Sequence, residues 1–155
     1  MNTIKIQKER ITQLPTNNTI SKNGSVVYWM SRDQRVLDSW ALLKAQEIAI
    51  NKEVPLIVLF CLSPSFLDAT IRQYSFMLRG LQEIEKTLAS LNISFIMLLN
   101  SPEKALPDFI NQFHCSTVVC DFDPLPIKRN RKKSIASKLH VPLIEVDAHN
   151  IIPCR

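Results

Sequence analysis

Glycine is nearly absent from this sequence, and its scarcity excludes the commonest kinds of nucleotide site. The 155 residues include two glycines, Gly24 and Gly80. Phosphate-binding loops such as GxGxxG and the P-loop need glycine, because the backbone N–H groups must approach the anion closely. Neither glycine lies between an expected strand and the helix that follows it. We therefore do not expect a self-contained dinucleotide or NTP site of these kinds.

Metal-ligand motifs and long apolar runs are lacking as well. The four cysteines show no CxxC spacing, and they are Cys61, Cys115, Cys120 and Cys154. This pattern fits neither a zinc site nor a disulfide framework. No stretch approaches the ~20 apolar residues that a membrane span needs, and the N-terminus has no apolar core typical of a secretory signal. We expect a reduced, cytoplasmic protein without a metal site and without a membrane partner.

Positive charge is in excess, with a formal net charge of +5. Such a balance is compatible with nucleic-acid binding but does not demonstrate it. One basic run stands out, consisting of Lys128, Arg129, Arg131, Lys132 and Lys133. Clustered cations can bind phosphates by releasing counterions. No aromatic residues alternate with them, however, although base stacking would require aromatics, so a solvated helix face is the favoured interpretation.

From about residue 24 onward, apolar runs alternate with helical periodicity. The expected strands are residues 26–30, 55–62, 93–99, 117–122 and 142–146. The expected helices are residues 39–52, 70–91, a segment starting near 101, and 127–139. We expect Asp38 to cap the first helix and Pro107 to kink or split the third.

This alternation predicts an α/β fold with a doubly wound, five-stranded parallel sheet in the order 3-2-1-4-5. The fold would be Rossmann-like but without a glycine-rich dinucleotide loop. Residues 1–23 are polar and are expected to form an extended or poorly ordered arm, whereas residues 24–155 form the α/β domain.

A candidate site follows from this strand order. Ligands of such sheets bind at the carboxyl ends of the strands, beside the point where the strand order reverses. Here that point lies between the first and fourth expected strands, after VVYWM and VVCDF. The residues expected at the ends of strands one, two and four are Met30, Ser31, Arg32, Asp33, Cys61, Leu62, Asp121 and Phe122.

Four segments resemble class II cyclobutane-pyrimidine-dimer DNA photolyases. They are YWMSRDQRVLDSWALLKAQEIA, FLDATIRQYSFMLRGLQEIEKTL, CDFDPLPIKRNR and VDAHNIIPC, and the likeness extends over roughly residues 9–154. It implies the N-terminal α/β domain of a deoxyribodipyrimidine photolyase, a carbon-carbon lyase that repairs damaged DNA. The partner would be a C-terminal helical domain that binds FAD and that this chain does not include.

The resemblance also implies roles for individual residues. The eight strand-end residues above would bind an antenna chromophore, which in this family is a deazaflavin, a folate or FMN. The interface with the FAD domain would be formed by Arg35, Phe76, Gly80, His149 and Asn150. The chain would contribute pigment binding and docking, without a catalytic residue of its own.

The chain departs from the family pattern at a few positions. Photolyases of this class tend to carry Ser, Arg and Trp where this chain has Asp123, Pro126 and Arg131, and Trp where it has Arg155. These differences motivate an alternative, a stand-alone photolyase-related binding module without repair activity. A nucleotide-binding domain like that of stress proteins is a third hypothesis, which the missing glycines disfavour.

Overall fold

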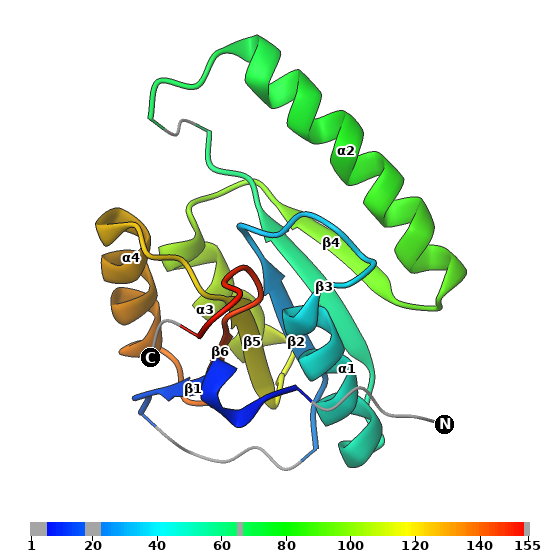
Figure 1. Ribbon diagram of the computed structural model, residues 1–155, viewed down its shortest axis with the longest axis vertical. Helices are drawn as coiled ribbons and strands as arrows, with labels where there is room; N and C mark the ends of the chain where they lie inside the picture. Colours follow the sequence, from blue (N-terminus) through cyan, green and yellow to red (C-terminus); the bar gives the residue numbers. More distant parts are fainter. Residues whose placement is uncertain (1–5, 18–22, 65–66, 154–155) are drawn as a thin grey trace.

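The chain folds into three layers, with a six-stranded sheet between two pairs of helices (Figure 1). The computed structural model describes residues 6–17, 23–64 and 67–153. The strands are β1 (Ile11–Leu14), β2 (Val26–Met30), β3 (Leu56–Cys61), β4 (Ser94–Leu98), β5 (Thr117–Asp121) and β6 (Leu143–Val146). Their order across the sheet is β1-β6-β5-β2-β3-β4.

The five parallel strands and their order are as predicted. Strand β2 lies at the centre, buried along its whole length, and pairs in parallel with both β3 and β5. The strand order therefore reverses beside β2, as the sequence indicated.

The predicted number of five strands is wrong, because the polar N-terminal segment supplies a sixth. A 3-10 turn, η1 (Lys8–Arg10), leads into β1, which pairs antiparallel with β6. Ile11 lies opposite Val146, and Leu14 lies opposite Leu143. Strand β1 covers the exposed edge of β6, and such covering protects a sheet from pairing with other chains.

Two helices pack on each face of the sheet. Helices α1 (Trp40–Lys52) and α2 (Ile71–Ser90) contribute to one apolar core, and α3 (Pro102–Gln112) and α4 (Pro126–Ala136) contribute to the other. Within the described residues, no helix is long and apolar enough to cross a membrane.

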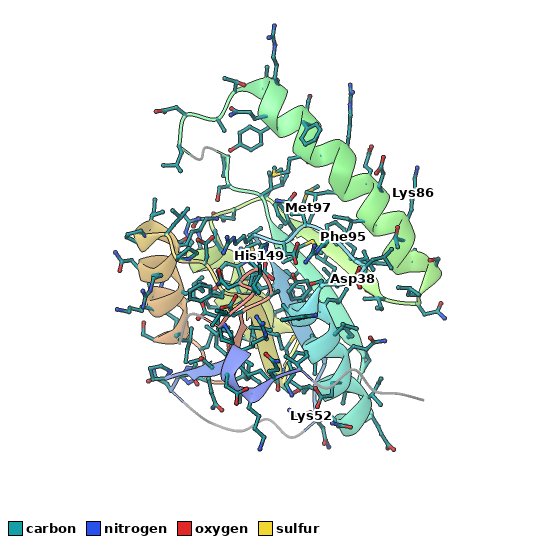
Figure 2. All side chains as sticks on the ribbon, viewed as in Figure 1. Asp38, Lys52, Lys86, Phe95, Met97 and His149 are labelled. Atoms are coloured by element: carbon teal, nitrogen blue, oxygen red, sulfur yellow. The ribbon has the colours of Figure 1, made fainter. Side chains whose placement is uncertain are left out.

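Two local expectations for the helices are wrong. Helix α1 is capped by Ser39, whose Oγ accepts a hydrogen bond from Leu42 N, and not by Asp38. Asp38 instead has a positive φ of 56°, which turns the chain just before the helix (Figure 2). Helix α3 continues through Pro107, so the predicted split does not occur.

Helix α2 buries residues against the sheet in its C-terminal half, and Met77 and Leu78 near its middle pack partly buried against the same core. Leu81, Ile84 and Leu88 are buried there, and Lys86 points away from the sheet (Figure 2). In the N-terminal half, Ile71 is 79% exposed and Phe76 is 83% exposed. This half extends past the end of the sheet (Figure 1), so the residues on its inner side can line a pocket at the strand ends.

The two glycines have opposite surroundings. A Cβ added to Gly24 would lie 2.0 Å from the carbonyl oxygen of His114, so the close approach of two backbone segments requires glycine there. A Cβ added to Gly80 would meet no atom within 4 Å. Gly80 therefore leaves an open position in the middle of α2.

Candidate functional site

The loop after β2 is organised by one carboxylate from the neighbouring strand. Asp121, at the end of β5, is fully buried. Its Oδ2 accepts hydrogen bonds from the backbone N–H groups of Ser31, Arg32 and Asp33 at 3.1, 2.9 and 3.1 Å. Its Oδ1 accepts a hydrogen bond from the Tyr28 hydroxyl at 2.7 Å.

Three successive N–H groups that converge on one oxygen form an anion-binding concavity of the kind that often binds phosphate. Here the anion is part of the protein. The Asp121 carboxylate occupies the position that a phosphate would take, so the loop needs no glycine to let a ligand approach. This geometry explains how a charged, glycine-free segment can follow a buried strand.

A second group of charges surrounds Asp33 on the outer side of this loop. The Nε of Arg35 lies 3.0 Å from both carboxylate oxygens of Asp33. His149 approaches from the C-terminal segment, with Nε2 3.9 Å from Asp33 Oδ1, and lies near the centre of the view in Figure 2. Burial raises the pKa of Asp33, and the positive charges of Arg35 and His149 oppose that rise. The pKa of Tyr28 is raised well above its ordinary value, chiefly by burial and then by the Asp121 charge.

A pocket of about 230 Å³ lies at the carboxyl ends of β2 and β3, beside the N-terminal half of α2. Its apolar surface includes Trp29, Met30, Phe60, Leu62 and Met77, and its polar groups include Ser31, Gln34, Cys61, Gln73 and Tyr74. The Tyr74 hydroxyl donates to the backbone oxygen of Ser63 at 2.9 Å, which ties α2 to the segment after β3. Burial raises the pKa of Cys61 to about 12, so this thiol stays protonated.

Helix α4 brings two cations to the same pocket, Lys128 and Arg131. Arg131 Nε donates to Glu103 Oε1 on α3 at 2.6 Å. The basic run is therefore not one surface. Lys132 is buried and pairs with Glu145 of β6, whereas Arg129 and Lys133 are exposed.

The N-terminal segment holds the chain that follows β6. Arg10 is 5% exposed, and its guanidinium donates to the backbone oxygens of Asp147, Asn150 and Ile151 at 3.3, 2.6 and 2.8 Å. The same guanidinium lies 4.2 Å from the ring centroid of Trp40, which is cation–π distance. The path of residues 147–151 is thus set by a residue from the other end of the chain.

The structure divides the eight predicted chromophore contacts into two groups. Met30, Ser31, Cys61 and Leu62 line the pocket. Arg32, Asp33, Asp121 and Phe122 belong to the loop cluster beside it, where Arg32 Nη1 donates to the Phe122 oxygen at 3.3 Å.

The five predicted interface residues lie in two places. Arg35, His149 and Asn150 lie near Asp33 and the C-terminal segment. Phe76 and Gly80 lie on the exposed N-terminal half of α2. Among the described residues, no group of three His, Cys, Asp or Glu side chains is placed to hold a metal ion.

Sequence reasoning missed much of the pocket surface. The aromatic and thioether groups of Trp29, Phe60 and Met77 read as ordinary core residues. Tyr74 fits the apolar spacing of its helix equally well, so nothing in the sequence sets it apart. One signal was available: Arg131 falls in the apolar stripe of the predicted fourth helix, and a cation in such a stripe indicates a buried ion pair or a site.

The chain is a doubly wound α/β domain with a pocket at the carboxyl ends of its central strands. A family model described as DNA photolyase matches residues 26–155. The chain is 49% identical over 135 residues to a deoxyribodipyrimidine photo-lyase of Potorous tridactylus, covering 86% of this chain and 25% of that protein. It is 38% identical over 159 residues to one of Arabidopsis thaliana, covering 97% of this chain and 32% of that protein. The chain belongs to the DNA photolyase family, and the resemblance inferred from its sequence is confirmed.

Two solved structures share the fold. A cryptochrome from Synechocystis matches with a TM-score of 0.65 at 15% identity, covering 74% of this chain and 25% of that one. A universal stress protein from Archaeoglobus fulgidus, solved in complex with dAMP, matches with a TM-score of 0.59 at 14% identity. The match covers 82% of this chain and 100% of the stress protein. At these identities the likeness concerns the fold alone. The chain spans about a quarter to a third of the length of the curated photolyases described above.

Proposed function

We propose that this chain is the antenna-side domain of a light-dependent DNA-repair photolyase. In this role it binds an antenna chromophore in the pocket at the ends of β2 and β3, and it docks onto a helical domain that carries FAD. The observation that carries the proposal is the pocket itself, an apolar slot with a few polar groups beside the strand-order reversal. Such slots are where α/β sheets bind planar ligands.

The residues present fit a planar chromophore. Trp29, Phe60 and Met77 offer apolar surface for a ring, while Ser31 and Gln34 offer hydrogen-bonding groups for its edge. An antenna chromophore, when bound, absorbs light and passes the excitation energy to the flavin. The volume of about 230 Å³ is below the roughly 300–1,000 Å³ of complete small-molecule sites. We therefore propose that this chain encloses part of the chromophore and that a second surface covers the remainder.

The exposed apolar residues support a docking surface beside the pocket. Phe76 and Ile71 project from the half of α2 that extends past the sheet. Arg35 and His149 provide charged groups at the neighbouring loop. A helical FAD domain that covers these residues would also close the pocket. Damaged DNA would be bound and repaired by the whole protein, at the flavin, and no residue of this chain takes part in bond cleavage.

The buried Asp121 argues against a phosphate site at the loop after β2. Its carboxylate already accepts the three N–H groups that a nucleotide phosphate would use. This observation favours the antenna hypothesis over the nucleotide-binding alternative.

A titration of the purified chain with a deazaflavin, a folate and FMN tests the proposal, with fluorescence polarisation as the measurement. We expect weak, saturable binding of at least one of them. The Leu62→Trp variant should weaken it about tenfold or more, because the larger side chain fills the pocket. Leu37→Trp is the matched control, since Leu37 is exposed on a loop and does not line the pocket. Lack of binding by all three compounds, or binding that Leu62→Trp leaves unchanged, would refute the proposal.

A further inference from the structure

We propose that the pocket selects a planar heteroaromatic ligand that carries an anionic group, and that Lys128 and Arg131 of α4 bind that group. This inference rests on the proposed antenna site and adds the charge class of its ligand. Both residues line the pocket, and they are three positions apart on one helix. Side chains at this spacing lie on the same helix face. They can therefore act on one ligand group together.

The charged side chains that line the pocket in the described part of the chain are the cations Lys128 and Arg131. Around Lys128 lie the positive charges of Arg131 and Lys132 and the negative charges of Asp123 and Glu103. Lys132 is buried and paired with Glu145, and neither lines the pocket. In the described part of the chain, no Asp or Glu side chain lines the pocket, whereas Lys128 and Arg131 do. A bound anion would thus meet two cations on the pocket surface, with the nearby carboxylate, Glu103, already bonded to Arg131.

Arg131 is held in place for such a contact. Its side chain is 16% exposed, and Glu103 accepts from its Nε at 2.6 Å. A guanidinium has five N–H donors in a fixed planar arrangement, so the contact to Glu103 uses one and orients the others. Because Glu103 binds Arg131 from outside the pocket lining, it fixes the guanidinium without placing negative charge on the pocket surface.

Lys128 is partly desolvated, which strengthens its attraction to a nearby anion. Burial lowers the pKa of Lys128, and the neighbouring Arg131 charge lowers it further, while Asp123 and Glu103 oppose the change. Removing a charge from water is costly unless an opposite charge compensates, and attraction between charges is stronger in such surroundings than in water. A ligand anion would add to the compensation that Asp123 and Glu103 already provide.

Two flavins with the same ring test the inference, because FMN carries a phosphate and riboflavin does not. We would titrate each into the 155-residue chain at neutral pH and low salt and follow fluorescence polarisation. FMN should bind about tenfold or more tightly than riboflavin, as expected for hydrogen bonds to charged groups. The difference should shrink at high salt, because screening weakens exposed charge interactions.

The ratio of the two affinities is also the readout for variants. Lys128→Met should bring the ratio close to one. Arg131→Met should be made together with Glu103→Gln, since Arg131→Met alone would leave a carboxylate without its partner, and the double variant should lower the ratio as well. Lys133→Met is the matched control, because Lys133 is exposed on the same helix and does not line the pocket. It should keep the wild-type ratio.

Each outcome decides a different point. Equal affinity for FMN and riboflavin in the wild-type chain, or a ratio that survives both pocket variants, overturns the selection for an anionic group while leaving the antenna site in place. Absence of binding by both flavins, by a deazaflavin and by a folate overturns the antenna site and this inference together. A high ratio that Lys128→Met abolishes and Lys133→Met preserves supports the assignment.

Discussion

Replacing Asp121 is the most direct test of how the loop after β2 is built. In the Asp121→Ala variant, the N–H groups of Ser31, Arg32 and Asp33 lose their acceptor. The Tyr28 hydroxyl loses its bond to Asp121 and keeps only the Asp33 backbone oxygen, at 3.4 Å. A buried donor left without a partner costs about 1–3 kcal/mol. Tyr28 and Asp33 are buried, whereas Ser31 and Arg32 can regain water. Counting the orphaned N–H of Asp33 and the weakened bond of Tyr28, we expect a loss of about 2–4 kcal/mol in the free energy of unfolding.

Asp121→Asn should lower the free energy of unfolding by less, about 1–2 kcal/mol. The amide oxygen can still accept from the backbone N–H groups, and the amide NH₂ can donate to the Tyr28 oxygen, because a tyrosine hydroxyl both donates and accepts. What is lost is the negative charge, which makes such hydrogen bonds stronger. We therefore expect the free energy of unfolding to decrease from wild type to Asp121→Asn and further to Asp121→Ala.

Urea unfolding followed by circular dichroism at neutral pH measures these differences. Asp123→Ala is the matched control, two positions along the chain, because Asp123 Oδ1 accepts one local hydrogen bond from Leu125 N at 3.1 Å. Losing this hydrogen bond should lower the free energy of unfolding by about 1 kcal/mol. Sulfate should stabilise Asp121→Ala more than wild type, since the freed N–H groups can bind an anion. If Asp121→Ala costs no more than Asp123→Ala, the carboxylate does not organise the loop.

Three further predictions concern other parts of the chain. Gly80→Ala should stabilise the protein by up to about 1 kcal/mol, whereas Gly24→Ala should destabilise it strongly because its Cβ would overlap a backbone oxygen. Thermal unfolding of the two variants measures the difference, and equal effects would contradict the packing described. Arg10→Ala should cost about 2–4 kcal/mol and expose residues 147–151 to limited proteolysis, and an unchanged cleavage pattern would count against its role. Burial raises the pKa of Asp33, so the folded protein binds the carboxyl proton of Asp33 more tightly than the unfolded chain does. The free energy of unfolding therefore falls as the pH rises from about 4 towards the raised pKa of Asp33. In urea titrations Asp33→Asn should therefore gain stability relative to wild type over that window, and a constant difference would refute the assignment.

The sheet could be predicted because its central strands are covered on both faces. Strands such as β2 and β3 then read as continuous apolar runs, and the lengths of the segments between them indicate helices. Strand β1 gave no such signal. It has four residues, includes the polar Thr12 and Gln13, and pairs only at the edge of the sheet.

The pocket at the strand ends could be predicted only in part, because four of the eight predicted residues line it. The strand-order reversal lies between β2 and β5, whereas the pocket lies at the ends of β2 and β3: Met30 and Leu62 line it, and Asp121 and Phe122 do not. The use of Asp121 by three backbone N–H groups has no sequence signature, because the donors carry no side-chain information. The pocket also depends on how far α2 extends past the sheet, and helical periodicity does not determine that distance.

Arg10 connects the two ends of the described chain through side-chain hydrogen bonds to the backbone. Its guanidinium fastens residues 147, 150 and 151 to the 3-10 turn that precedes β1. Shortening the N-terminus beyond residue 9 would therefore change the direction in which the C-terminal segment leaves the sheet, at a distance of 140 positions along the chain. Changes in the first turn and changes in residues 147–151 therefore act on one shared set of hydrogen bonds.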